Sequence, residues 1–207
     1  MDLVSQLVNL FIILCVRDLL PVINTKLVVL FLKFGRIKME FSDVIKNRIS
    51  IRKFTKQPVE KEKIDSLLKT MAVAPSASNR QKWKFVAVTD KQTLEKLTVA
   101  AESRPPVSLA PLVFCICSTE NIEVNDSGLN RGTIDGSIAS TYLHLAVTDL
   151  GLGCCWVGSF DQKLAAQAIG LPDYAKIISL FAIGYADESP SPRPRRPLEE
   201  VISYDKF

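Results

Sequence analysis

The sequence predicts an α+β fold, because helical and strand-like segments follow one another without the regular alternation that a doubly wound parallel sheet requires. Of the 207 residues, 47% are hydrophobic and 23% are charged, a composition typical of one globular domain with a sizeable core. Five cations but only two acidic residues lie in residues 1–38, so residues 39–207 carry only +1 of the total charge of +4. We therefore expect no nucleic-acid partner.

Two helices and a strand are predicted before residue 102. Residues 60–74 place apolar side chains at helical spacing, and Pro75 ends this helix. Residues 83–89 alternate in polarity and are rich in strand-forming residues. Residues 90–101 form the next predicted helix, with Asp90 as its N-cap.

A short apolar strand is predicted at residues 112–118. Its Cys115 and Cys117 fall on one face at a spacing of two, which favours packing in the core. The polar and irregular residues 119–131 are predicted to form a loop.

The longest predicted helix covers residues 133–150 and ends at Gly151. It is apolar around most of its circumference and should be buried on all sides, which suggests a central helix or a subunit interface. After Asp187 the chain is proline-rich and basic, which predicts an extended arm lying across a surface. The other predicted elements are two strands and a helix, at residues 153–158, 177–184 and 161–169.

The cysteines show neither a disulfide framework nor the spacing of a zinc site, and we expect no metal. They are Cys15, Cys115, Cys117, Cys154 and Cys155, an odd number that includes one vicinal pair. A reducing cytoplasm is the simplest location for such a chain. His144 is the sole histidine, and its apolar helix indicates a core or interface residue.

Residues 1–38 form an atypical hydrophobic N-terminal extension. Its apolar runs, residues 3–16 and 27–32, are shorter than the roughly 20 residues that a membrane span needs. The flanking residues do not suit a signal peptide either. We expect translation to start at Met39, so that residues 39–207 are the domain. An interfacial anchor on anionic lipid and a hydrophobic extra element are the alternatives.

The chain lacks the common catalytic motifs: a dinucleotide-binding glycine motif, a Walker loop, a nucleophile elbow and the zinc-protease motif. With its one histidine in an apolar helix, a Ser-His-Asp or Cys-His apparatus is not expected. A compact domain without a recognisable acid–base catalytic motif is expected to take its reactivity from a cofactor.

Arg48, Ser50 and Arg52 would share one side of an extended segment, with Ile49 and Ile51 on the other. Two guanidinium groups and a hydroxyl on one face suit a phosphate, because the arginine fork matches phosphate oxygens. A solvated strand edge explains the same pattern equally well.

Two other segments could contact a flat ligand. Residues 74–83 include Asn79 and Gln81, whose amides suit the edge of a heteroaromatic ring. Residues 151–158 contain three glycines, which allow close backbone approach to a ring. A plain helix-to-strand loop, and glycines at a helix end and a strand turn, are the alternative explanations.

In this order and spacing, the motifs resemble those of the nitroreductase family of FMN-dependent oxidoreductases, over residues 40–203. The matching motifs are Arg-x-Ser-x-Arg at 48–52 followed by Phe54, Ala-Pro-Ser-x-x-Asn-x-Gln-x-Trp at 74–83, Asp135, Gly-Leu-Gly-x-x-Trp at 151–156, Ile-Gly-Tyr at 183–185 and Arg-Arg-Pro-Leu-Glu-Glu at 195–200. Lys82 departs from the family, which usually has proline at this position.

The resemblance implies a central mixed or antiparallel sheet flanked by helices, a long buried helix and a C-terminal arm that reaches the partner subunit. It also implies non-covalent FMN at the interface of a homodimer. Arg48, Ser50 and Arg52 would hold the FMN phosphate, joined by one or both of Arg195 and Arg196. The groups facing the ring would be the amides of Asn79 and Gln81, the partner's Ser76, Ala77 and Ser78, and the backbone at Cys154, Cys155 and Gly158.

The reaction implied by the resemblance is hydride transfer from NAD(P)H to flavin N5, then reduction of nitroaromatics, quinones or similar electron-poor acceptors. FMN supplies the chemistry, so no side chain is assigned as a catalytic group. The vicinal thiols Cys154 and Cys155 are interpreted as packing groups, and a redox role is the alternative. One alternative is a specialised flavoprotein of the same fold, for dehalogenation, enone reduction or flavin fragmentation. The other is a non-enzymatic, membrane-associated redox carrier anchored by residues 1–38.

Overall fold

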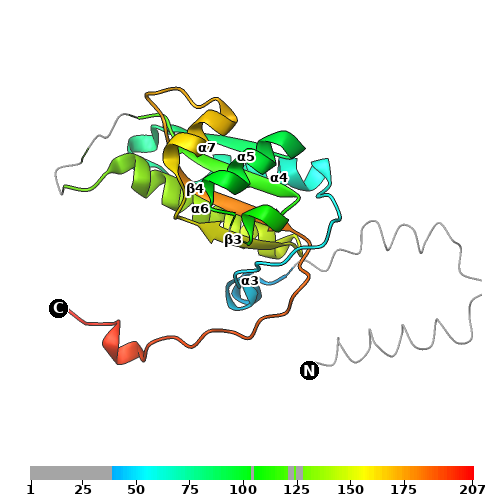
Figure 1. Ribbon diagram of the computed structural model, residues 1–207. Coiled ribbons are helices and arrows are strands. Elements are labelled where there is room, and N and C mark those ends of the chain that lie inside the picture. Colours follow the sequence, from blue (N-terminus) through cyan, green and yellow to red (C-terminus); the bar gives the residue numbers. More distant parts are fainter. Residues whose placement is uncertain (1–38, 104, 121–123, 125–127) are drawn as a thin grey trace, which may run out of the picture. The chain divides into compact units, whose positions relative to one another are not determined.

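The computed structural model describes residues 39–103, 105–120, 124 and 128–207 (Figure 1). The compact unit that it defines is Glu40–Phe207. The N-terminal extension lies outside the described residues, so its start site and its role stay predictions. None of the described helices has the length and apolar character of a membrane span.

A four-stranded antiparallel sheet forms the centre of the domain, in the order β1-β2-β4-β3. An isolated parallel bridge from Ser50 to Cys154 adds one mixed pairing beside β3. All four predicted strands are confirmed to within one residue at each end. Their bounds are β1 Trp83–Val88, β2 Leu112–Ser118, β3 Gly153–Val157 and β4 Lys176–Gly184.

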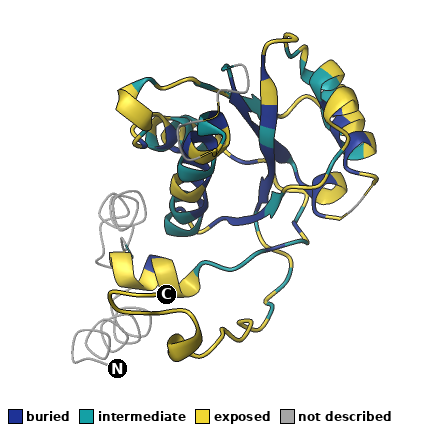
Figure 2. Cartoon of the chain, turned by 90° about the vertical axis from the view of Figure 1, so that its left-hand side faces the viewer, coloured by how far each residue is buried: buried dark blue, intermediate teal, exposed yellow. Residues whose placement is uncertain are grey.

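Helices pack on both faces of this sheet. On one face lie α4 (Lys61–Ala72) and α6 (Arg131–Asp149), and on the other lie α5 (Lys91–Ala100) and α7 (Gln162–Ile169). A short helix, α3 (Phe41–Asn47), precedes them and contacts α6. In Figure 2 the strands are mostly buried, whereas the outward sides of the helices are exposed.

Strand β2 is buried along its whole length, because both of its faces are covered. Phe114 and Ile116 pack with α4 and α6, while Cys115 and Cys117 pack with α5 and α7. This alternation confirms that the two cysteines are core residues. Burial raises the pKa of Cys117 to about 12, so its thiol is protonated at neutral pH.

A β-bulge in β4 brings α6 close to the sheet. The register shifts between Ile116 and Cys117 of β2, so consecutive residues Ile178 and Ser179 of β4 both face α6. The hydroxyls of Ser179 and Ser140 lie 3.0 Å apart. A Cβ on Gly136 would lie 3.0 Å from the Ile178 side chain, so a larger residue there would push Ile178 aside.

Two predictions about helix ends can be compared with the structure. Asp90 caps α5 as predicted, and its carboxylate accepts hydrogen bonds from the N–H and hydroxyl of Thr93 at 2.9 and 2.8 Å. Helix α6 begins at Arg131, two residues before the predicted start. The reason is its N-cap, because the side-chain oxygen of Asn130 accepts a hydrogen bond from the Thr133 N–H at 2.7 Å.

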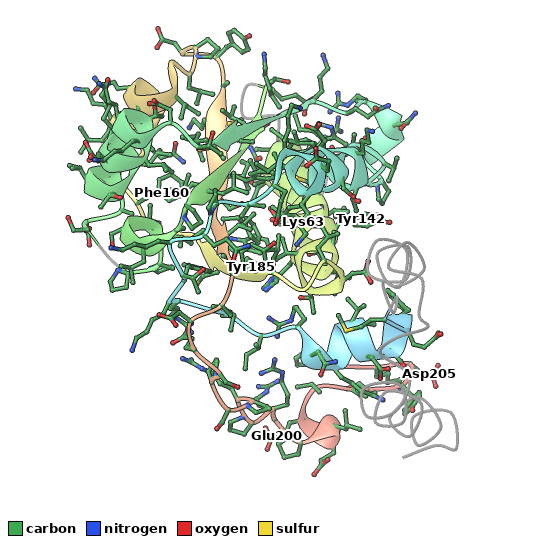
Figure 3. All side chains as sticks on the ribbon, turned by 90° about the vertical axis from the view of Figure 1, so that its right-hand side faces the viewer. Lys63, Tyr142, Phe160, Tyr185, Glu200 and Asp205 are labelled. Atoms are coloured by element: carbon green, nitrogen blue, oxygen red, sulfur yellow. The ribbon has the colours of Figure 1, made fainter. Side chains whose placement is uncertain are left out.

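Among the described residues of one chain, helix α6 is buried on one side only, so the expected burial of its other side stays a prediction. Leu143 and Val147 are fully buried, whereas Ile134 is 37% exposed and Tyr142 is 38% exposed (Figure 3). The domain core therefore does not explain why the exposed side of α6 is also apolar, and a subunit interface on that side stays a prediction.

The arm after Asp187 contains no long helix, as predicted. Its one regular element is a short 3-10 turn, η3 (Leu198–Glu200), and residues 193–207 are all exposed. The described residues leave the arm's predicted contact with a partner subunit as a prediction.

Candidate functional site

The predicted phosphate-binding segment lies along β3. The N–H of Ile51 donates a hydrogen bond to the Cys154 carbonyl at 2.9 Å. Ile51 is buried against the core, while Arg48, Ser50 and Arg52 are only half-buried, so the predicted alternation is present. A Cβ on Gly153 would lie 2.8 Å from the Ile51 Cβ, so glycine is what allows the segment this close to β3.

The same segment is bonded on its other side to the root of the C-terminal arm. Thr55 donates from its N–H to the Tyr185 carbonyl at 2.9 Å, and Asp187 donates to the Lys53 carbonyl at the same distance. One step further, the N–H of Arg52 donates to the Glu188 carboxylate at 2.5 Å. Residues 48–52, called the clamp segment below, are therefore held between β3 and the arm.

Tyr185 also fastens the start of α4 to the end of β4. Its hydroxyl donates to the Glu60 carboxylate at 2.7 Å and accepts from the Lys63 ammonium at 2.6 Å (Figure 3). The hydrogen bond from Tyr185 and the charge of Lys63 lower the pKa of Glu60. This cluster closes the loop that carries residues 48–60.

Arg48 contacts the sole histidine. Its Nη1 lies 3.5 Å from His144 Nε2, and the imidazole lies edge-on to Phe181 with 5.8 Å between ring centroids. His144 is 7% exposed, which confirms its expected burial. Burial and the charge of Arg48 lower the pKa of His144 to about 4, so the imidazole is neutral at pH 7.

The vicinal cysteines of β3 are both buried. Cys154 packs with the residues under α4 and α6, and the thiol of Cys155 approaches the Trp156 carbonyl at 3.6 Å. Burial raises the pKa of both thiols. Protonated thiols are poor nucleophiles, which agrees with a packing role for these side chains.

The loop before β1 has an unusual backbone. Ser78, Asn79 and Gln81 have φ values of 51°, 53° and 51°, in the left-handed region that non-glycine residues rarely adopt. Such conformations persist only where the surroundings enforce them, and they cluster at functional sites.

Hydrogen bonds from inside and outside this loop hold it. The N–H of Ala77 donates to Asp135 Oδ1 at 3.0 Å, and Asp135 is only 3% exposed in α6. The N–H of Gln81 donates to Ser76 Oγ at 3.0 Å, and its side-chain amide donates to Asn79 Oδ1 at 3.1 Å. The predicted ring-facing residues are therefore brought together in one ordered loop.

An ion pair anchors the same loop to the end of β2. The Arg80 guanidinium lies 2.8 Å from the carboxylate of Glu120, whose side chain is 7% exposed. A buried charge pair of this kind fixes geometry more than it adds stability.

Within one chain, the clamp segment and the ring-facing loop are bonded to different turns of α6. The loop is bonded to Asp135 and the clamp to His144, nine residues further on. At a rise of 1.5 Å per residue, these anchor points are about 13 Å apart along the helix axis.

The two arginines of the arm are exposed and bond only within the arm. Arg195 donates to the Arg193 carbonyl at 3.4 Å, and Arg196 donates to the Glu200 carbonyl at 3.1 Å. Among the described residues, neither guanidinium contacts residues 48–52. Gly158 lies just beyond β3, exposed and with space around its Cα.

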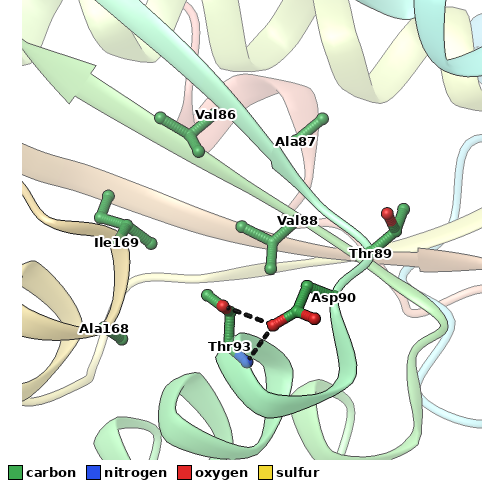
Figure 4. A pocket seen from close by; sticks show the side chains of 8 residues that line it. All are labelled: Val86, Ala87, Val88, Thr89, Asp90, Thr93, Ala168 and Ile169. Atoms are coloured by element: carbon green, nitrogen blue, oxygen red, sulfur yellow. Dashed lines mark hydrogen bonds between the residues drawn. The ribbon is translucent and has the colours of Figure 1, made fainter.

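The hollows found in the single chain lie elsewhere. One of ≈ 300 Å³ opens between β1 and α7, beside the Asp90–Thr93 cap (Figure 4). A second of ≈ 350 Å³ lies between α5 and α7. None of the predicted site residues lines either of these two hollows.

Comparison with known proteins decides the family. The sequence model of the nitroreductase family matches residues 45–119 and 104–185, which is more than half of the chain. The chain belongs to the nitroreductase family. This confirms the family and the fold that the motifs predicted.

Named relatives agree with this assignment. The FMN reductase [NAD(P)H] of Bacillus subtilis is 28% identical over 175 residues, covering 76% of this chain and 70% of its own length. A nitroreductase family protein from Clostridium difficile 630 superimposes with a TM-score of 0.74 at 29% identity, covering 82% of this chain and 100% of that one. An FMN-dependent nitroreductase from Clostridium difficile R20291 superimposes with a TM-score of 0.69 at 29% identity, covering 79% and 98%.

Three residues that hold the candidate site of this family member in place are not part of the sequence motifs, and sequence reasoning gave them no role in the site. His144 contacts Arg48 because α6 packs next to the clamp segment. Glu188 accepts from the Arg52 N–H because the start of the C-terminal arm lies beside the same segment. Glu120 anchors the loop through Arg80. No local pattern signals these contacts, because each joins segments far apart in the sequence.

Proposed function

We propose that this nitroreductase family member uses non-covalent FMN to pass electrons from NAD(P)H to electron-poor acceptors such as nitroaromatics and quinones. The family and the names of its relatives support an NAD(P)H-dependent flavin oxidoreductase. The observation that carries the proposal is the clamp segment, where two arginines and a serine share one half-buried side against β3.

The donors of this segment fit the phosphate of FMN. Arg48, Ser50 and Arg52 together offer a hydroxyl and two guanidinium forks, the chemistry that recognises a phosphate dianion. Each charge-assisted hydrogen bond contributes about 1.5–3 kcal/mol. Arg195 or Arg196 would add a cation if the arm of one subunit reaches this site.

The strained loop fits the ring of the flavin. The amides of Asn79 and Gln81 carry donors and acceptors for a pyrimidine edge, and the residues 76–78 would pack on the ring from the partner subunit. The backbone at Cys154, Cys155 and Gly158 would form the wall behind it. The separation of the loop and clamp along α6 supports a site completed by two subunits.

A homodimer is therefore part of the proposal. Among the described residues, nothing covers the exposed side of α6 or the apolar side chains of the arm. The apolar residues concerned are Ile134, Tyr142, Leu198, Val201, Ile202 and Tyr204. A second copy that covers them would also bring each loop to the other subunit's clamp.

In this mechanism the chain's residues bind and orient. When bound, FMN would supply the redox chemistry, taking a hydride from NAD(P)H at N5 and delivering it to the acceptor. Arg48, Ser50 and Arg52 would fix the phosphate end, and the loop amides would orient the ring. Backbone N–H groups near residues 154–158 would stabilise negative charge on the reduced ring.

The test is a visible spectrum of the purified full chain, followed by heat release and identification of any flavin. We expect a yellow protein that releases FMN, is bleached by NADH or NADPH without oxygen and is restored by a quinone or a nitroaromatic. A protein that remains colourless after incubation with FMN would refute the proposal. Bleaching by neither nucleotide, with FMN bound, would instead favour a non-enzymatic carrier.

A further inference from the structure

We propose that His144 is a positioning residue for the phosphate of the flavin, acting through the guanidinium of Arg48. This inference rests on the proposed function, because it assigns a second residue to the phosphate end of the FMN site. His144 lies on α6, and among the described residues Arg48 is the clamp side chain within hydrogen-bond distance of its ring.

The geometry gives the imidazole an acceptor role. Nη1 of Arg48 lies 3.5 Å from Nε2 of His144, and a guanidinium can only donate. The tautomer with its proton on Nδ1 leaves the Nε2 lone pair free to accept from Arg48.

The ring itself is well fixed. His144 is 7% exposed, and its edge-on contact with Phe181 of β4 restricts rotation of the imidazole. Arg48 is half-buried at the start of the clamp segment. A rigid acceptor therefore holds a long, flexible side chain that would otherwise sample many rotamers.

Holding Arg48 at one nitrogen leaves most of its donors available. The guanidinium has five N–H groups, and His144 is its one hydrogen-bond partner among the described residues. Pre-orienting the fork reduces the entropy lost when an anion binds. A carboxylate in this place would compete with the phosphate for the guanidinium, whereas a neutral imidazole adds no negative charge.

The test compares FMN with riboflavin, which lacks the phosphate, by fluorescence titration of each apoprotein at pH 7.5. The dissociation constant of riboflavin divided by that of FMN measures the contribution of the phosphate alone. We expect His144→Leu, which removes the acceptor, to reduce this ratio about tenfold, and His144→Gln, which keeps an acceptor, to stay within about threefold of wild type.

Two controls distinguish an effect on the position of Arg48 from a general loss of folded structure. Leu143→Ala removes a fully buried core side chain next to His144 on α6, so it should weaken FMN and riboflavin alike. In an Arg48→Ala background, His144→Leu should have no further effect on the ratio.

The outcomes are distinct. If wild-type protein binds no FMN, the proposed function fails and the inference fails with it. If Arg48→Ala reduces the ratio but His144→Leu does not, the proposed function stands and the inference is wrong. An equal loss of FMN and riboflavin affinity in His144→Leu also overturns it, because the histidine would then act only on the fold.

Discussion

The buried carboxylate of Asp135 accepts a hydrogen bond from the backbone N–H of Ala77, 58 residues away in the sequence. Through this one contact, the first turns of α6 hold a loop in which three non-glycine residues have positive φ values. The loop's conformation therefore depends on a residue outside it, and removing that residue tests how the site is maintained.

Asp135→Ala should lower the free energy of unfolding by about 1–3 kcal/mol, because the Ala77 N–H loses its acceptor. Asp135→Asn keeps an oxygen at the same place and should lose less. Urea unfolding measures both, and limited proteolysis should show faster cleavage in residues 76–81 of the alanine variant. Equal stability of the two variants would show that the hydrogen bond does not maintain the loop.

Replacing both Arg48 and Arg52 by alanine should give colourless protein that added FMN does not readily restore. Two guanidinium groups that contact the phosphate would be lost, each contributing about 1.5–3 kcal/mol. Lys53→Ala is the matched control, since it removes a cation from the same segment at a position between the clamp and Phe54. Stoichiometric flavin in the double variant would remove both arginines from the phosphate role.

His144 should make the protein less stable as the pH falls. Its pKa is about 4 in the folded chain against an ordinary value of 6.5, so the unfolded state binds the extra proton between these values. The contribution is fully present above pH 6.5 and is lost on acidification towards pH 4, by roughly 3 kcal/mol in total. Urea unfolding at several pH values should show a shallower dependence for His144→Leu than for wild type.

Gly153→Ala should displace the clamp segment, because the new Cβ would lie 2.8 Å from the Ile51 Cβ. We expect a loss of about 1–3 kcal/mol in stability, as for other overpacked sites, together with weaker FMN binding. Adding Ile51→Gly removes the Cβ and both Cγ atoms that clash with the new Cβ and should restore part of the FMN affinity. If Gly153→Ala alone binds FMN as wild type does, the close approach of the two segments is not needed for binding.

Tyr142→Glu should weaken the proposed homodimer, because it places a charge on the exposed apolar side of α6. Light scattering after size-exclusion chromatography would report the mass. The matched control is Leu164→Glu on α7, where a 42% exposed leucine lies on a helix of the opposite layer. A wild-type monomer, or a dimer insensitive to Tyr142→Glu, would contradict the proposed assembly.

The sequence by itself determined the elements of this fold. Each predicted strand lies within one residue of its observed bounds, because period-two alternation and flanking turn residues are local properties. The Asp90 cap was equally local. The start of α6 was missed by two residues because the sequence does not show which polar residue before the helix will become its cap.

The sequence also determined the family, through the order of motifs from Arg48 to Glu200. Within the clamp segment, alternation predicted that Ile51 is buried and that the arginines are less buried, as observed. The interpretation of Cys115, Cys117 and His144 as buried residues needed only the apolar character of their surroundings.

Only the tertiary structure decided which residues hold those motifs in place. The pairs Ala77–Asp135, Arg48–His144 and Arg52–Glu188 each join segments at least 58 residues apart. Such contacts depend on how helices and the arm cross the sheet, which no local periodicity encodes. The physical reason is that a hydrogen bond requires two groups at a set distance and angle, and packing of the whole chain sets both.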